Sequence, residues 1–410
     1  MRTTMATENN NKTLNVPNLR FPEFSGEWES NELHKVASLS KGAGISKDQL
    51  SDSGHPCILY GELYTKYKSE IIREVYSKTQ LDVANLVKSH TNDVIIPCSG
   101  EAAIEIATAR CVLIPDVLLG GDLNIIRLNG RHDGGFFAYQ LNGKRKVDIA
   151  KVAQGVSVVH LYGEHLKKVK VAYPSLEEQQ KISSFLALLD ERIATQIKII
   201  EDLKKLKSAI SKHLFARKDL LETTICLSDI ATLKNGYAFQ SSKYNPLGKW
   251  KILTIANVSG ERNINDEDCN CIINLPSDIQ NHQVLKEGDI LISLTGNVGR
   301  VSLCKAGNYL LNQRVGLLQF TNNANREFIY QVLSSRRFEN SMIACGQGAA
   351  QMNIGKGDVE DYTIPYSANS LNLEVVASTL KTYDLLISVE VDRLRLFMQQ
   401  KQYLLAQMFI

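Results

Sequence analysis

The side chains best suited to chemistry in this sequence are amide and basic side chains that lie near glycines. The run GQGAAQMNIGKG at 346–357 carries three amide side chains, those of Gln347, Gln351 and Asn353. Glycine lets a backbone come close to another molecule, and amide side chains pair with adenine edges in the major groove of DNA. The run therefore predicts a contact with DNA. A surface turn that binds nothing is the alternative interpretation.

Two further stretches of the second half have the same character, GYAFQSSKY at 236–244 and TGNVGR at 295–300. In the first, hydroxyl and ammonium groups could hold phosphates while an amide reads a base edge. In the second, an amide and a guanidinium follow a strand in a tight turn. In the first stretch we expect Phe239 in the core and the polar side chains outside it. For the second stretch, a turn whose arginine is merely solvated is the alternative interpretation. The candidate residues are Gln240, Ser241, Lys243, Asn297 and Arg300.

The first half offers a different set of candidates. LYTKYK at 63–68 alternates aromatic and basic residues, and as a strand it would turn one face toward a phosphate backbone or simply toward solvent. Glu101 could accept a hydrogen bond from cytosine, but we favour a role in capping the helix that follows. The candidate DNA contacts of this half are Lys41, Tyr64, Lys66, Lys68, Ser99, Gly100 and Glu101.

Catalytic spacings are missing from the sequence. It contains no G-x-x-x-x-G-K-[ST] loop, no H-E-x-x-H pair and no Asn- or Asp-Pro-Pro-aromatic motif. The only close cysteine pair, Cys269 and Cys271, lacks the two-residue gap of a zinc site. We therefore expect a binding protein without a metal or cofactor of its own, and no enzyme.

Composition sets the frame for these residues. A chain of 410 residues predicts two to three domains, and 44% hydrophobic with 22% charged residues is an ordinary globular composition. The net charge of +3 is small for a protein that binds nucleic acid. It counts against such a function unless partner chains supply the phosphate contacts. Scattered cysteines and the lack of a membrane-length apolar run predict a cytoplasmic protein with reduced thiols.

A long helix is predicted from Glu177 to Ala216, a stretch without proline or glycine. Ser175 can cap its start, and two glutamates fall in the first turn, where they suit the helix dipole. Forty residues of helix span roughly 60 Å. Apolar residues repeat in a heptad and predict a coiled-coil seam; the first column holds Leu186, Ile193, Ile200 and Leu214.

The same helix occurs twice. A shift of 194 residues superposes residues 179–216 on 373–410, where the corresponding column is Leu380, Ile387, Leu394 and Met408. Polar residues match as well: Lys207 meets Lys401, Gln196 meets Glu390 and Asp190 meets Asp384. Shared polar interruptions favour a true internal repeat. Each lysine could lay its stem along apolar surface or fix the register of the seam, and both interpretations stay open.

Short strands and one helix are predicted in the first globular part. The strands are CILY at 57–60, DVIIPC at 93–98, CVLIP at 111–115 and LNIIRL at 123–128, and the helix covers 136–141. Equivalents of several of these recur in the second half. The fold class is therefore α+β: two globular mixed α/β domains separated by two long antiparallel coiled-coil helices, related by a pseudo-two-fold repeat.

The predicted division has five parts. Residues 1–15 form a disordered tail, 16–174 the first domain, 175–217 the central helix, 218–366 the second domain, and 367–410 the distal helix.

Several stretches of the sequence resemble a known family, the specificity (S) subunits of type I restriction–modification systems. EEQQKISSFLALLDERI at 177–193, with IEDLKKLKSAISKHLF at 200–215, is similar to the central conserved helix of that family. VPNLRFPEFSGEWE at 16–29 and GDILISLTGNVGR at 288–300 resemble the start of its chains and its target-recognition-domain framework.

The resemblance implies a function. Each target recognition domain would read one half of a bipartite site in double-stranded DNA, and the helices would set the gap between the halves. The helices would also dock two methyltransferase (M) subunits, which use S-adenosylmethionine to methylate adenine. Restriction (R) subunits, which use ATP and Mg, would join the complex. The alternative is a two-headed coiled-coil scaffold that binds protein partners instead of DNA.

Overall fold

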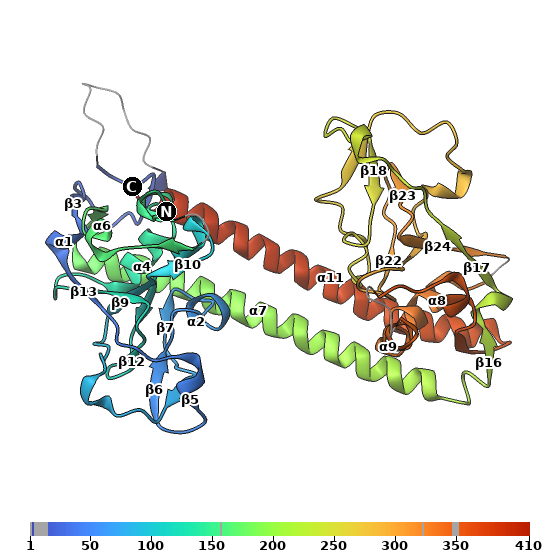
Figure 1. Ribbon diagram of the computed structural model, residues 1–410, viewed down its shortest axis with the longest axis horizontal. Coiled ribbons are helices and arrows are strands. Elements are labelled where there is room, and N and C mark those ends of the chain that lie inside the picture. Colours follow the sequence, from blue (N-terminus) through green and yellow to red (C-terminus); the bar gives the residue numbers. More distant parts are fainter. Residues whose placement is uncertain (1, 4–14, 156–157, 322–323, 347–351) are drawn as a thin grey trace. The chain divides into compact units, whose positions relative to one another are not determined.

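The computed structural model describes residues 2–3, 15–155, 158–321, 324–346 and 352–410 (Figure 1). The chain divides into two compact units. Unit 1 comprises Met1–Ile197 with Asp392–Ile410, and unit 2 comprises Lys198–Val391. Because each boundary falls inside a long helix, each unit contains one globular part and a stretch of both helices.

The two long helices are α7 (Leu176–Ala216) and α11 (Ser370–Gln407). Ser175 caps α7 as predicted, because its Oγ accepts a hydrogen bond from the Glu178 amide at 3.4 Å. Asn369 does the same for α11, through the Leu371 amide at 3.0 Å. The first part of α7 lies with the last part of α11 in unit 1, and the reverse holds in unit 2. This is the order of an antiparallel pair.

The predicted seam is buried within each unit. Leu186 and Leu189 of α7 pack with Leu404 of α11 in the core of unit 1. In unit 2, Leu214 packs against a core that contains Leu380. Ile200 and Ile387 are also buried, whereas Ile193 and Leu394 are half-buried. Most of the stability of these helices therefore comes from packing their apolar face.

Unit 1 is built on a mixed sheet. Its strands, in spatial order, are β4 (Ala37–Lys41), β13 (Leu123–Leu128), β9 (Asp93–Pro97), β11 (Arg110–Val112) and β7 (Ile71–Ile72). Only the β11–β7 pairing is parallel. A second sheet has the order β12 (Leu118–Leu119), β6 (His55–Ile58), β8 (Ser77–Thr79) and β5 (Leu50–Ser51). All four strands predicted for this part are confirmed.

Further strands pair in twos: β3 (Glu29–Glu32) with β15 (Lys170–Tyr173), β10 (Ser99–Gly100) with β14 (Val159–His160), and β1 (Arg2–Thr3) with β2 (Leu19–Arg20). The short helices are α1 (Leu33–Val36), α2 (Glu62–Thr65), α3 (Ala103–Ile106), α4 (Gly134–Asn142), α5 (Lys146–Val152) and α6 (Gly163–Leu166).

Helix α4 occupies the centre of unit 1 and confirms the helix predicted at 136–141. Asp133 caps it by accepting from the Phe136 amide at 2.7 Å. Phe136 packs between Trp28 and Phe409, with ring centroids 5.6 and 5.1 Å away. The last residues of the chain thus complete the core of the first unit.

Unit 2 repeats this plan. Its main sheet has the order β17 (Ala231–Asn235), β24 (Val315–Phe320), β21 (Ile290–Ser293) and β22 (Val301–Leu303). The second sheet has the order β19 (Asn270–Ile272), β18 (Trp250–Leu253), β23 (Tyr309–Leu311) and β20 (Val284–Leu285). A further pair joins β16 (Thr223–Cys226) to β25 (Thr363–Tyr366), and the short helices are α8 (Arg326–Leu333), α9 (Arg336–Cys345) and α10 (Lys356–Glu360).

The pairings confirm the internal repeat. Strand β13 lies between β4 and β9 in unit 1, as β24 lies between β17 and β21 in unit 2. The parallel pairing of β12 with β6 corresponds to that of β23 with β18. The two units are therefore copies of one topology.

Three local predictions need correction or restriction. LYTKYK is not a strand: its first three residues lie in α2 (Glu62–Thr65), and Leu63 and Tyr67, four positions apart, are both buried, which suits helical rather than alternating spacing. Glu101 does not cap α3, whose N-cap is Ala102 without a side-chain bond. In the predicted tail, Arg2–Thr3 pair with β2, while residues 1 and 4–14 lie outside the described residues.

Candidate nucleic-acid interface

The clearest repeated surface feature is a pair of loops that follow β9 and β21. In unit 1, Ser99 pairs with His160 through β10 and β14. In unit 2, Thr295 pairs with Asn353 in the same antiparallel sense. Ser99 of unit 1 and Thr295 of unit 2 therefore hold equivalent places in the two copies. Gln347 and Gln351 of the adjoining glycine-rich run lie outside the described residues.

In unit 2 this loop is shaped by glycine. Gly299 has φ +76°, and a Cβ there would lie 2.6 Å from the Met342 Cβ, so only glycine fits. The turn leaves Asn297 exposed, as is Asn353. Arg300 is half-buried, and its Nε lies 3.6 Å from a carboxylate oxygen of Glu339. The two amides are open to a ligand, whereas the arginine already has a protein partner.

The segment 236–244 forms one wall of a cavity of about 460 Å³ in unit 2. Gln240 and Lys243 line it, and with Ser241 they are exposed, as predicted. Phe239 is half-buried against the cluster that contains Ile252. The polar side chains of this segment are therefore available at the surface.

The basic candidates of unit 1 are less free. Lys66 forms an ion pair with the buried carboxylate of Glu62 at 2.7 Å and donates to Ser77 Oγ at 2.6 Å. Lys68 Nζ donates to the Tyr64 carbonyl at 3.1 Å. The Tyr64 hydroxyl is buried and has no hydrogen-bond partner among the described residues, and burial raises the pKa of Tyr64 above its ordinary range. These side chains are not a row on one strand face.

Lys41 and Glu101 are exposed, and Ser99 and Gly100 are half-buried. Lys41 ends β4, beside Asn124 of β13. These residues remain candidates by exposure.

Each unit also contains a charge cluster that was not predicted from the sequence, although both clusters include a seam lysine. In unit 1, Lys401 Nζ lies 2.6 Å from Asp190 Oδ1 and 2.5 Å from Glu70 Oε2. Tyr139 donates to Asp190 at 2.7 Å. Burial raises the pKa of Glu70, whereas for Asp190 the ion pair with Lys401 outweighs burial and lowers the pKa.

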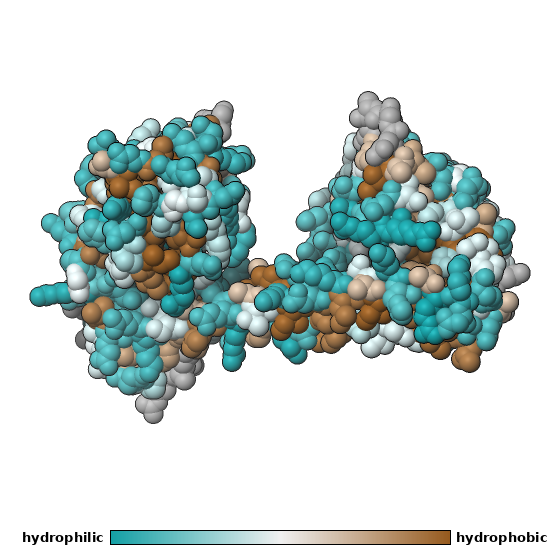
Figure 2. Space-filling model, turned by 90° about the horizontal axis from the view of Figure 1, so that it is seen from below, coloured by the Kyte–Doolittle hydropathy of each residue, from teal (hydrophilic) through white to brown (hydrophobic). Residues whose placement is uncertain are grey.

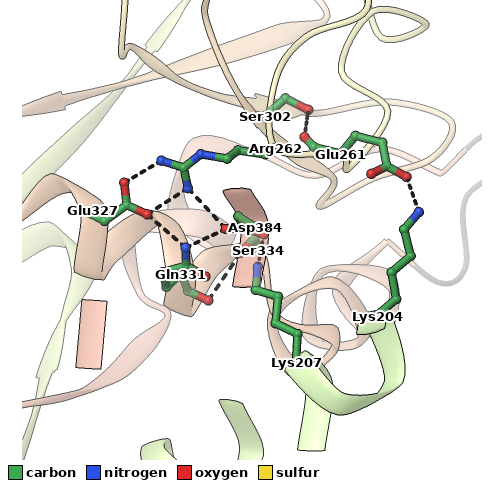
Figure 3. Close-up of polar contacts among 9 residues, drawn as sticks. All are labelled: Lys204, Lys207, Glu261, Arg262, Ser302, Glu327, Gln331, Ser334 and Asp384. Atoms are coloured by element: carbon green, nitrogen blue, oxygen red, sulfur yellow. Dashed lines mark hydrogen bonds and ion pairs between the residues drawn. The ribbon is translucent and has the colours of Figure 1, made fainter. Parts of the chain in front are cut away.

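The cluster of unit 2 is shown in Figure 3. Lys207 Nζ lies 2.5 Å from Asp384 Oδ1, and Arg262 reaches the other oxygen of Asp384 at 3.1 Å. Arg262 also makes two hydrogen bonds to Glu327, at 2.6 and 2.8 Å, and Gln331 donates to Asp384 at 2.7 Å. Each seam lysine pairs with an aspartate of the other long helix, as expected of a polar break that fixes the register of the seam.

The outer side of α11 carries a second apolar stripe. Besides Val391, which falls on the seam side, five aliphatic side chains of the part within unit 2 are exposed: Leu371, Val375, Leu385, Leu386 and Val389. At 100° per residue they fall on one side, opposite the buried Val376, Leu380 and Ile387. Figure 2 shows apolar surface along the long helices on one face of the molecule. A helix that is apolar on two opposite sides suits one partner on each side.

Among the described residues no group of three or more His, Cys, Asp or Glu side chains could hold a metal ion. In the same part of the chain, no helix is both long enough and apolar enough to cross a membrane.

Two copies of one α/β unit on a pair of antiparallel helices, with different polar side chains in equivalent loops, define a class of two-headed recognition proteins. The chain belongs to a known family of that class, because residues 25–205 and 222–394 each match the type I restriction modification DNA specificity domain. Catalysis in these systems is the task of other subunits.

Similar proteins agree with this assignment. The putative type I restriction enzyme MjaX specificity subunit of Methanocaldococcus jannaschii is 23% identical over 408 residues, covering 92% of each chain. The type I restriction–modification S subunit from M. genitalium has a similar fold, with a TM-score of 0.61 and 16% identity over 96% of this chain and 99% of that one. A chain from a structure of a type I R-M complex matches with a TM-score of 0.54 and 15% identity, over 92% and 96%.

Proposed function

We propose that this chain is the DNA sequence-recognition subunit of a type I restriction–modification complex, and that each globular part reads one half of a bipartite site. The observation that carries the proposal is the double match to the specificity domain, one match for each unit. The retained framework and the changed loop residues support it: Thr295 and Asn353 of unit 2 replace Ser99 and His160 of unit 1.

For unit 2 the base-reading residues are Gln240, Asn297 and Asn353, with phosphate contacts from Ser241 and Lys243. The three amides are exposed, and amides suit adenine edges. Arg300 can join them by leaving Glu339. For unit 1 we propose Lys41, Ser99, Gly100 and Glu101, with Tyr64, Lys66 and Lys68 in supporting positions.

The long helices set the gap between the half-sites and dock two methyltransferase subunits. The exposed apolar stripe of α11 supports docking by a helical partner, because Leu371 and Val375, and fourteen residues on Leu385 and Val389, fall at heptad positions, with Ser378 and Thr382 between them. Restriction subunits join the same complex. S-adenosylmethionine, ATP and Mg belong to these partners, and the cytoplasm is the compartment in which all of them meet DNA.

The test is base-resolution mapping of adenine methylation. Cells that express this chain with its methyltransferase subunit are compared with cells that express the methyltransferase alone. A split motif that appears only with this chain supports the proposal. A methylome that the chain does not change, with no DNA binding by the purified pair, would instead favour a scaffold for protein partners.

Two sets of variants test separately the DNA contacts of unit 2 and the docking of the methyltransferase on α11. Gln240→Ala with Lys243→Ala should weaken or relax one half-site and leave the other unchanged, since each good base contact is worth about 1–3 kcal/mol. Val389→Glu on the α11 stripe should abolish co-purification of the methyltransferase. Val147→Glu is its matched control, because Val147 and Val389 are 54% and 55% exposed. Equal co-purification of both variants would contradict docking at the stripe.

A further inference from the structure

One position in each globular part reaches α11, and it carries opposite charges in the two units. Glu70 precedes β7, and its carbonyl accepts from the Cys111 amide of β11 at 2.8 Å. Arg262 stands where Glu70 stands in the other copy, since its carbonyl accepts from the Leu303 amide of β22 at 2.7 Å. The next residues agree: Ile71 pairs with Cys111 in parallel, and the residue after Arg262 pairs with Leu303 in parallel.

The helices present the same two charges to both positions. Asp190 and Lys401 in unit 1 correspond by the 194-residue repeat to Asp384 and Lys207 in unit 2. Each aspartate pairs with the lysine of its own unit across the two helices, at 2.6 and 2.5 Å. This repeated Lys–Asp pair is called the socket below.

Each globular part selects the member of its socket that has the opposite charge. Glu70 contacts Lys401 at 2.5 Å, and Arg262 contacts Asp384 at 3.1 Å. In both units the selected residue lies on α11. The added charge is balanced in unit 2 by Glu327, which holds Arg262 with two hydrogen bonds.

The surroundings make these contacts strong. Side chains of Glu70, Asp190 and Asp384 are at most 8% exposed, and those of Lys401 and Arg262 are 16% exposed. An unpaired charge at such depth is costly, so an arrangement that misaligns the pair is strongly disfavoured. Buried polar contacts of this kind are known to select one register among several that apolar packing alone would permit.

We propose that the residue at this position, Glu70 in unit 1 and Arg262 in unit 2, is a charge key that fixes how each recognition domain seats on the helix pair. The inference rests on the proposed function in one respect. By fixing the position of each recognition domain on the helix pair, the charge key restricts the complex to a single gap between the two half-sites. These are positioning residues, distinct from the loop residues proposed to touch DNA.

The experiment exchanges the key of unit 2 for that of unit 1. Arg262→Glu alone places three carboxylates beside Lys207 and should unseat the domain. Adding Glu327→Gln leaves two carboxylates and one lysine, the contacts that Glu70, Asp190 and Lys401 make in unit 1 with the buried Arg110 nearby, and should restore the seat. Lys204→Met is the control, because it removes only the exposed contact between Lys204 and Glu261 (Figure 3).

Methylation mapping is the first measurement. R262E should methylate sites whose gap differs by one base pair as well as parental sites, with both half-sites unchanged. R262E/E327Q and the control should keep the parental gap. A single parental gap for R262E, or a broadened gap that E327Q fails to narrow, would overturn the charge key. If R262E does not fold, Arg262→Gln replaces it in the comparison, with the same expected broadening and the same contrary result.

Amide hydrogen exchange of the purified chain is the second measurement, and it does not depend on DNA. R262E should exchange at least tenfold faster than wild type in α8 and around Asp384, whereas R262E/E327Q and K204M should match wild type. If neither the wild type nor any variant directs methylation, the proposed function fails. Amide hydrogen exchange then tests on its own whether Arg262 fixes the packing of the domain on the helix pair. Unchanged exchange in R262E would overturn the charge key.

Discussion

Lys401 neutralises two buried carboxylates at once, because its ammonium group lies 2.6 Å from Asp190 and 2.5 Å from Glu70. Its counterpart Lys207 contacts one carboxylate, Asp384, which Arg262 also contacts. The two lysines occupy equivalent positions in the repeat, but Lys401 pairs with two carboxylates and Lys207 with only one.

Lys401→Met should therefore destabilise unit 1 by about 3–5 kcal/mol, the usual cost of breaking a buried ion pair from one side. Lys207→Met should destabilise unit 2 by only about 1 kcal/mol, because Arg262 still neutralises Asp384. The chain has two tryptophans, Trp28 in unit 1 and Trp250 in unit 2, so single-tryptophan variants report urea unfolding of each unit. Equal losses for the two lysines would contradict the asymmetry.

Phe409→Ala should destabilise unit 1 by about 3–5 kcal/mol, because the Phe409 ring is buried against Phe136 and Trp28. Trp28 fluorescence measures the effect directly. Leu396→Ala, on α11 ahead of Phe409, is the control, since Leu396 is exposed and its truncation removes little packing. A shift in the unfolding midpoint reported by Trp250, with none reported by Trp28, would be contrary to this account.

A matched deletion should shorten the gap and keep both half-sites. Sixteen residues lie between Asp190 and Lys207 on α7, and sixteen between Asp384 and Lys401 on α11. Removing one heptad from each stretch keeps both Lys–Asp pairs and shortens the helices by about 10 Å, or about three base pairs of B-DNA. Methylation mapping reads the new gap. Altered half-sites with an unchanged gap would rule out the helices as the spacer.

The stability of unit 2 should depend on pH through Asp266. Its pKa lies well below the ordinary value because Lys251, Lys305 and Tyr309 donate hydrogen bonds to its carboxylate, at 2.7, 2.9 and 2.9 Å. A folded-state pKa below the unfolded value stabilises the fold above about pH 4, and the contribution is lost as the pH falls through the folded-state pKa.

Asp266→Asn should accordingly cost about 1–2 kcal/mol at pH 7 and less at pH 3, where the unfolded state binds the proton but the folded carboxylate does not, by urea unfolding followed at Trp250. Asp268→Asn, two residues away and exposed, serves as the control. A loss for D266N of the same size at both pH values would show that the carboxylate charge is not responsible.

Regular features of the fold were predictable because their signals are periodic. The seam of α7 and α11, the cap at Ser175 and the strands near 93–98 and 123–128 all follow from local residue patterns. LYTKYK misled because alternating aromatic and basic residues also place Leu63 and Tyr67 one helical turn apart. Which of the two patterns is realised depends on tertiary burial, which a six-residue stretch does not contain.

The charge clusters were only half predictable. Lys207 and Lys401 stand out because they interrupt an apolar column, but nothing near them names their partners. Glu70 is more than three hundred residues away from Lys401 in the chain. Comparison of the two halves also conceals the relationship between Glu70 and Arg262, since residues of opposite charge do not align as similar.

The placement of Met408 and Phe409 in the core of unit 1 has a consequence for synthesis on the ribosome. The N-terminal unit of a two-domain chain ordinarily folds first, but here its core lacks side chains that are synthesised only after the whole of unit 2. At 5–20 residues per second, the interval between residue 173 and the final turn of α11 is on the order of tens of seconds. Unit 2, whose residues are contiguous, can mature before unit 1. A nascent chain that is released early would then carry one finished recognition surface and one unfinished one.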